Sequence, residues 1–148
     1  MRDVVIVDSV RTGLTKAFRG SFNLTRSDDL LAHCIDSLLD RNPQLGADEV
    51  EDVYVGAASH TGEQDGNLAR LAVILSKLPV TAAGVTINRF CSSGLQSIAL
   101  AANQIATGQT EVAIAGGVDS ISMRTRQEPG KAKQNQRCLL YTSPSPRD

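Results

Sequence analysis

Residues 84–117, GVTINRFCSSGLQSIALAANQIATGQTEVAIAGG, contain a complete strand, helix and strand pattern. Gly84–Asn88 is a short β-branched run, and Leu95–Thr107 carries apolar side chains at positions 95, 98, 99, 102, 105 and 106, which is helical spacing. Gly108 stands where a helix commonly ends in a residue of positive φ, and Val112–Ala115 predicts the next strand. Two strands joined by one helix form the unit of a parallel sheet, so we expect an α/β fold.

The same alternation extends toward the N-terminus. Val53–Ala57, VYVGA, predicts another strand, and Asn67–Lys77 predicts the helix that follows it. A longer helix is expected over Ser27–Arg41, where Thr25 has the spacing of a capping box. Val4–Val10, VVIVDSV, predicts a first strand that is covered on both faces. The sheet is therefore expected to be mixed but mainly parallel, with helices on its faces.

Beyond Met123 the hydrophobic pattern ends. Residues 124–137 are polar, charged and without period, which predicts a surface excursion or a disordered stretch. Cys138–Asp148, CLLYTSPSPRD, back-translates into one reading frame of a transposase sequencing adaptor, so we expect this tail to be foreign to the fold. Residues 1–123 are then expected to form one incomplete domain.

Composition bounds the possible functions. The 148 residues carry 15 basic and 16 acidic side chains, and a net charge of -1 gives no field that would attract nucleic acid or an anionic membrane. The N-terminal apolar run is too short for a signal peptide, and no apolar segment approaches the length of a membrane span. We therefore expect a cytoplasmic protein that binds no nucleic acid.

Three cysteines lie far apart, in none of the paired spacings of a zinc site and too few for a disulfide framework. Cys34 falls within the apolar stripe of its helix and is expected in the core, while Cys138 lies in the foreign tail. His33 is expected on a polar helix face and His60 in a loop. Only Cys91 is left as a candidate site residue.

Cys91 stands between a predicted strand and the start of a helix. The unpaired amides and positive dipole of a helix N-terminus favour a thiolate, and Cys91 with its backbone N–H could supply both nucleophile and oxyanion donor. The small residues Ser92, Ser93 and Gly94 leave room for a substrate. Position alone leaves a second interpretation open, in which Cys91 is a small buried hydrophobe.

Four motifs resemble the thiolase family in the same order along the chain. They are VVIVDSVRTG, GNLAR, NRFCSSGLQSI and IAGGVDSIS, together spanning the first 123 residues. NRFCSSGLQ, which contains Cys91, is the most specific of the four. The resemblance leans toward the 3-ketoacyl-CoA thiolases, and the acetoacetyl-CoA-forming biosynthetic thiolases share the same local pattern.

The resemblance implies the N-terminal half of the thiolase fold, a layered αβαβα arrangement built from two similar halves. It implies that Cys91 carries the acyl group as a thioester during thiolytic cleavage of 3-ketoacyl-CoA, or during the reverse Claisen condensation. Coenzyme A and acyl-CoA would be substrates, with no permanently bound cofactor. A histidine and a second cysteine would come from the C-terminal half, so the chain alone is expected to be inactive. Partners would be further copies in a homodimer or homotetramer, and a β-oxidation complex.

Other interpretations stay open at this stage. A related condensing enzyme, such as a ketoacyl synthase or hydroxymethylglutaryl-CoA synthase, also uses a cysteine on this fold. A thiolase-like lipid-binding protein would keep the fold without the chemistry. Around the cysteine, Gly116 and Gly117 would form either a tight turn or a place of close approach, and Asn88 and Arg89 could be purely structural. A basic cluster could meet CoA phosphates; it comprises Arg124, Arg126, Lys131 and Lys133.

Overall fold

Three parallel strands form one sheet in the computed structural model, which describes residues 2–124, 135 and 137. β1 (Asp52–Gly56) lies in the middle, between β2 (Ala83–Ile87) and β3 (Ala113–Gly117). In the register of the sheet, Tyr54 of β1 stands opposite Val85 on one side and Ala115 on the other. The expected α/β fold with a parallel sheet is confirmed.

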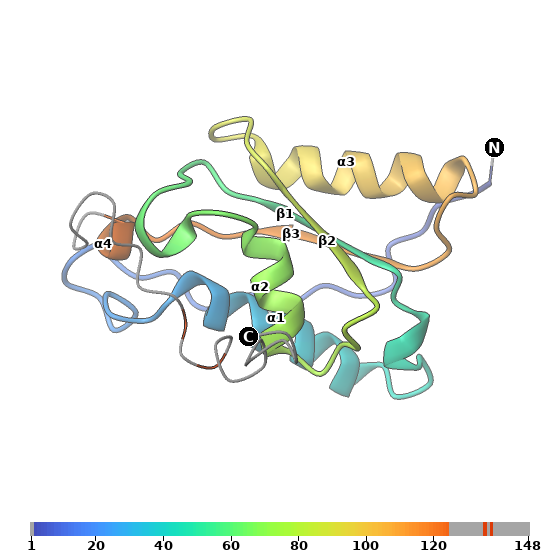
Figure 1. Cartoon of the computed structure of the whole chain (residues 1–148), viewed down its shortest axis with the longest axis horizontal. Coiled ribbons are helices and arrows are strands. Elements are labelled where there is room, and N and C mark those ends of the chain that lie inside the picture. The colour runs from blue at the N-terminus through green and yellow to red at the C-terminus, as the bar shows by residue number, and fades with distance from the viewer. Residues whose placement is uncertain (1, 125–134, 136, 138–148) are drawn as a thin grey trace, which may run out of the picture.

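Helices cover both faces of the sheet (Figure 1). α3 (Ser93–Ala106) runs along one face, whereas α1 (Ser27–Arg41) and α2 (Leu68–Leu75) lie on the other. Each of the three agrees with its expected range to within two residues. Three shorter elements complete the described fold: the 3-10 helices η1 (Ala47–Glu49) and η2 (Gly62–Gln64), and α4 (Ile121–Arg124).

The main core lies between the sheet and the helices α1 and α2. Val53 and Val55 of β1 are 1% and 2% exposed and pack with apolar side chains of both helices. The α3 side is built differently, because the residues that α3 buries are small: Ser93, Ser97 and Ala101. The wider apolar core therefore belongs to one face, and the other face holds a close helix-to-sheet contact.

That close contact depends on Gly56 at the carboxyl end of β1. A Cβ on Gly56 would overlap the backbone of Ser93 and would lie 2.5 Å from the amide nitrogen of Gly94. A Cβ on Gly117 would lie 2.8 Å from the carbonyl oxygen of Gly56 and 3.2 Å from the Cα of Gly94. The first turn of α3 is thus seated directly on the ends of β1 and β3.

The apolar stripe predicted for α3 faces away from the sheet. Leu95 is 72% exposed and Ile98 is 42% exposed, while the small side chain of Ser97 between them is buried. The prediction of the helix is confirmed, but α3 packs against the sheet with its small residues and not with its apolar stripe. The reason is the short distance between helix and sheet, which only small side chains can fill.

The prediction of a strand at Val4–Val10 was wrong for this structure. The segment belongs to no strand, and Val5, Ile6 and Val7 are 74%, 80% and 78% exposed. β-branched residues form a strand only where a neighbouring strand accepts their backbone hydrogen bonds. Within residues 2–124, both edges of β1 are occupied by β2 and β3, and neither of these pairs with the segment.

The capping box predicted at Thr25 was also wrong. The residue at the N-cap of α1 is Arg26, and no side chain of the cap itself accepts a hydrogen bond there. Instead Glu63 of η2 reaches across, and both its carboxylate oxygens accept from the amide of Ser27, at 3.0 and 3.1 Å. A residue 36 positions away therefore satisfies the first turn of α1.

Several expectations fall on residues outside the described part of the chain. They concern most of the polar excursion, namely 125–134 and 136, and the whole of the tail 138–148. Among the described residues, no helix is long and apolar enough to cross a lipid bilayer.

Replacing Gly56 by Ala is expected to lower the free energy of unfolding by about 2–3 kcal/mol, because the new Cβ must push α3 away from the sheet. Gly116→Ala is the matched control, since a Cβ there would meet nothing within 4 Å. The control should change stability by less than about 1 kcal/mol. Urea denaturation of the two variants measures the difference, and equal effects would contradict the close-contact interpretation.

Glu63 gives a prediction for pH. Burial raises the pKa of its carboxyl above the ordinary value of 4.5, against the hydrogen bonds from Ser27 and the charge of Arg26, which lower it. The folded state thus holds the proton more tightly than the unfolded state, so this contribution is present below pH 4.5 and is lost as the pH rises through the folded-state pKa. Denaturation curves at several pH values measure the free energy of unfolding of the wild type and of Glu63→Gln. The difference between the two should fall for the wild type as the pH rises from 4.5 through the folded-state pKa. A flat or rising difference would show that burial does not dominate.

Candidate functional site

Cys91 lies in the turn between β2 and α3, and its side chain is exposed. β2 ends at Ile87 and α3 begins at Ser93, so the turn occupies the carboxyl edge of the parallel sheet. This edge is where open α/β sheets place their ligands. The predicted position between strand and helix is confirmed, and the interpretation of Cys91 as a buried hydrophobe is contradicted by its exposure.

The residue before the cysteine has an unusual backbone. Phe90 has a φ of +49°, in the left-handed region that side chains with a Cβ rarely adopt. Its own side chain is 76% exposed and so contributes little packing that could hold this conformation. The chain reverses at Phe90, and the reversal presents Cys91 at the amino end of α3.

Polar side chains from both ends of the turn hold it together. Asn88 Oδ1 accepts from the amide of Phe90 at 2.9 Å, and Ser93 Oγ accepts from the amide of Arg89 at 2.8 Å. Ser93 Oγ also donates to the carbonyl of Phe90 at 2.6 Å. Arg89 donates to the side-chain oxygen of Gln96 one turn into α3. The sequence left open whether Asn88 and Arg89 are structural residues. In the structure both hold the turn together through hydrogen bonds.

The first turn of α3 keeps two amides available. The amide of Ser93 donates to the carbonyl of Phe90 and that of Gln96 to the carbonyl of Ser92. Within the described residues, no such bond engages the amides of Gly94 and Leu95. Unpaired amides and the positive end of a helix dipole favour a neighbouring anion, so this turn could accept one.

The glycine pair at the end of β3 lies beside this turn. Gly116 and Gly117 lie within β3 and do not form a tight turn. Ser97 Oγ lies 2.7 Å from the carbonyl oxygens of both Gly94 and Gly116, so that its one proton can be donated to either, and it ties α3 to β3. Of the two interpretations, close approach is supported for Gly117, whereas a Cβ on Gly116 would meet nothing within 4 Å.

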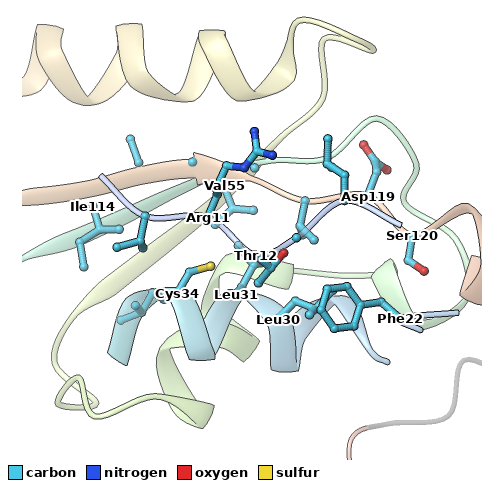
Figure 2. A pocket seen from close by; sticks show the side chains of 18 of the residues that line it. Arg11, Thr12, Phe22, Leu30, Leu31, Cys34, Val55, Ile114, Asp119 and Ser120 are labelled. Carbon is cyan, nitrogen blue, oxygen red and sulfur yellow. The ribbon is translucent and has the colours of Figure 1, made fainter. Parts of the chain in front are cut away.

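A cavity of about 410 Å³ lies elsewhere, on the opposite face of the sheet from α3 (Figure 2). It opens between α1, the segment that contains Arg11 and Thr12, and β3, and Cys91 is not among its lining residues. Cys34 is only half-buried and contributes to this lining rather than to a closed core. Burial raises the pKa of the Cys34 thiol, and a hydrogen bond from the backbone of Thr12 partly offsets this.

The histidines are not brought to the cysteine. His33 is exposed on α1, as expected, and His60 lies in the loop after β1 with its Nε2 3.1 Å from the carbonyl oxygen of Ala57. Across the described ranges, no three side chains of the His, Cys, Asp and Glu types are grouped as metal ligands. Of the basic cluster, all but the backbone of Arg124 lies outside the described residues.

Sequence reasoning missed one group of polar residues near the site. Asp119, just after β3, accepts from the amide of Ala58 at 2.9 Å and from the side chain of Gln64 at 3.0 Å. Gln64 is fully buried and also accepts from Ser27 Oγ at 2.9 Å. Their separation in sequence leaves no local pattern, so only the fold brings them together.

The structure is thus an α/β fold that exposes a cysteine between a strand and a helix, beside two amides of the first helical turn that no described residue engages. The sequence model of the family described as "Thiolase, N-terminal domain" matches residues 4–140. The chain therefore belongs to the thiolase family, by its N-terminal domain.

Curated relatives agree with this assignment. A beta-ketoadipyl-CoA thiolase of Pseudomonas knackmussii is 44% identical over 131 residues, which are 88% of this chain and 32% of that protein. A 3-ketoacyl-CoA thiolase of Cronobacter sakazakii is 44% identical over 119 residues, or 80% of this chain and 31% of that protein. The chain thus spans about a third of the length of these relatives.

The two described cysteines should differ in reactivity. Cys91 is exposed at a helix N-terminus, whereas burial raises the pKa of Cys34, so iodoacetamide should alkylate Cys91 at least about tenfold faster near neutral pH. Peptide mass spectrometry of a time course gives both rates. In denaturant the two rates should converge. Equal rates in the folded protein would contradict the geometry described for the turn.

Proposed function

We propose that the protein is an acyl-CoA C-acyltransferase of the thiolase class, in which Cys91 forms the covalent acyl intermediate. The observation that carries the proposal is the exposed Cys91 thiol at the amino end of α3, beside the free amides of Gly94 and Leu95. Family membership and the names of the relatives support the reaction class.

The reaction suits this geometry. The Cys91 thiolate attacks the 3-keto carbon of a 3-ketoacyl-CoA, and the bond between C2 and C3 breaks. The electron pair leaves with the acetyl-CoA fragment, which takes a proton at C2. The thiolate of a second CoA then attacks the acyl-cysteine and releases Cys91 with the shortened acyl-CoA. Sulfur serves both steps because a thiolate is a good nucleophile and a good leaving group.

The amides of the turn stabilise the negative oxygen that forms in each attack. The amide of Cys91 belongs to this set of donors in our proposal, together with the two unengaged amides of α3. The negative charge develops close to the backbone, and the small side chains of Ser92 and Ser93 leave space for the thioester to approach. Coenzyme A and acyl-CoA are the proposed substrates.

The proposed general bases lie outside this chain. Among the described residues, neither His33 nor His60 shares a hydrogen bond with Cys91. We therefore propose that the 148 residues accept an acyl group but do not turn over 3-ketoacyl-CoA. For the complete protein we propose a homodimer or homotetramer that works in the cytoplasm. A β-oxidation complex is the proposed larger setting.

A biosynthetic thiolase that condenses two acetyl-CoA molecules is the second candidate. It would use the same acyl-cysteine and run the carbon–carbon bond-forming step in reverse. The direction of the net reaction then depends on substrate supply and on groups other than Cys91, so the described site serves either direction.

Incubation with radiolabelled acetyl-CoA should place one acetyl group on Cys91. Cys91→Ala should lose the label completely, because no other described thiol lies at a helix N-terminus. Cys34→Ala is the matched control and should keep the label. Peptide mapping by mass spectrometry locates the acetyl group. Label retained in Cys91→Ala would exclude the proposed nucleophile, and multiple turnovers by the chain alone would contradict the proposed absence of its bases.

A further inference from the structure

A continuous series of hydrogen bonds leads from the buried polar group at Gln64 to the cysteine turn. Gln64 Nε2 donates to Asp119 Oδ1 at 3.0 Å, and Asp119 Oδ2 accepts from the amide of Ala58 at 2.9 Å. Asn88 Nδ2 then donates to the carbonyl of Ala58 at 3.3 Å. Asn88 thus joins the loop after β1 to the turn after β2.

Asn88 also acts on the strained residue itself. Its Oδ1 accepts from the amide of Phe90 two positions along, which is the Asx-turn arrangement. The two contacts use opposite ends of one side-chain amide, since one needs the oxygen as acceptor and the other needs the nitrogen as donor. The side chain therefore has a single orientation in which both are made.

Phe90 needs such support because its φ of +49° is unfavourable for a residue with a Cβ. Its exposed ring cannot provide it by packing. The oxygen of Asn88 holds the amide of Phe90 in the required direction, and the nitrogen of Asn88 anchors the turn to Ala58, which Asp119 fixes in turn.

We propose that Asn88 is a positioning residue for Cys91: it holds Phe90 in the left-handed conformation and so keeps the thiol at the amino end of α3. The proposal rests on the role of Cys91 as nucleophile. Asn88 touches no reacting atom and acts only through the conformation of Phe90.

The test is a double-mutant cycle read as the alkylation rate of Cys91 by iodoacetamide, measured on the whole chain. Asn88→Ala should slow the reaction about fivefold, because the turn relaxes and Cys91 leaves the helix end. In a Phe90→Gly background the same change should alter the rate less than about twofold, since glycine adopts positive φ without help. Asn88→Ser should give an intermediate rate, because a hydroxyl makes the same local turn more weakly.

Two comparisons separate positioning from a loss of stability. The rate of Cys34 is read from the same samples and should stay unchanged, whereas partial unfolding would raise it. Asn103→Ala is the matched control on α3, where the side chain is exposed and makes no hydrogen bond with other described residues, and it should leave the Cys91 rate unchanged. Far-ultraviolet circular dichroism checks the fold of each variant.

The results that overturn the proposal are specific. An unchanged Cys91 rate in Asn88→Ala would remove the role of Asn88, and equal slowing with and without Phe90→Gly would show that it does not act through Phe90. Should Asn88→Ala fail to fold, Asn88→Ser in the two backgrounds decides in the same way. The labelling with acetyl-CoA is independent of this cycle, so a failure of the acyl-transfer function and a failure of the positioning role give different results.

Discussion

The contact between the backbone of Ser93–Gly94 and the end of β1 sets the geometry on which the candidate site depends. It requires a residue without a Cβ at position 56, and a second close approach at Gly117 places the end of β3 against the same turn. A helix packed this close to the sheet brings the amides of its first turn to the carboxyl edge of the sheet. Cys91 is presented at that edge because the chain has only five residues, from Asn88 to Ser92, in which to leave β2 and enter α3.

The same contact explains why the two faces of the sheet differ. On the α2 side the helix also comes close at one point, where a Cβ on Gly84 would lie 2.9 Å from the amide nitrogen of Arg70, but large side chains fill the rest. On the α3 side only serine and alanine fit, so Leu95 and Ile98 are directed outward.

The fold was largely predictable because its main elements are local in sequence. The period of the apolar residues predicts the strands β1 to β3 and the helices α1 to α3, and the predicted bounds agree with the structure to within a few residues. The failures have a common cause, which is that the decisive partner is distant. Thr25 has the right spacing for a cap, but the carboxylate of Glu63 occupies the first turn of α1. Val4–Val10 has the right composition for a strand, but no described strand pairs with it. At the site, the position of Cys91 followed from its neighbours, whereas the left-handed Phe90 had no signal in the sequence apart from an asparagine two residues before it.

Magnitudes show how much chemistry the turn can supply. A charge at a helix terminus gains about 0.3–1 kcal/mol from the dipole, and a tenfold change in an equilibrium needs about 1.4 kcal/mol. The helix end alone therefore favours an anion by less than tenfold. A positioned general base contributes about 10²–10⁴-fold to a proton transfer, which is far more. His60 contacts the carbonyl of Ala57, and His33 is on α1. In the proposed reaction the described residues would therefore supply the nucleophile and the amides that stabilise its oxyanion. The larger kinetic factor of the proposed reaction would come from a base brought to Cys91, whose exposed thiol at the carboxyl edge of the sheet leaves room for its approach.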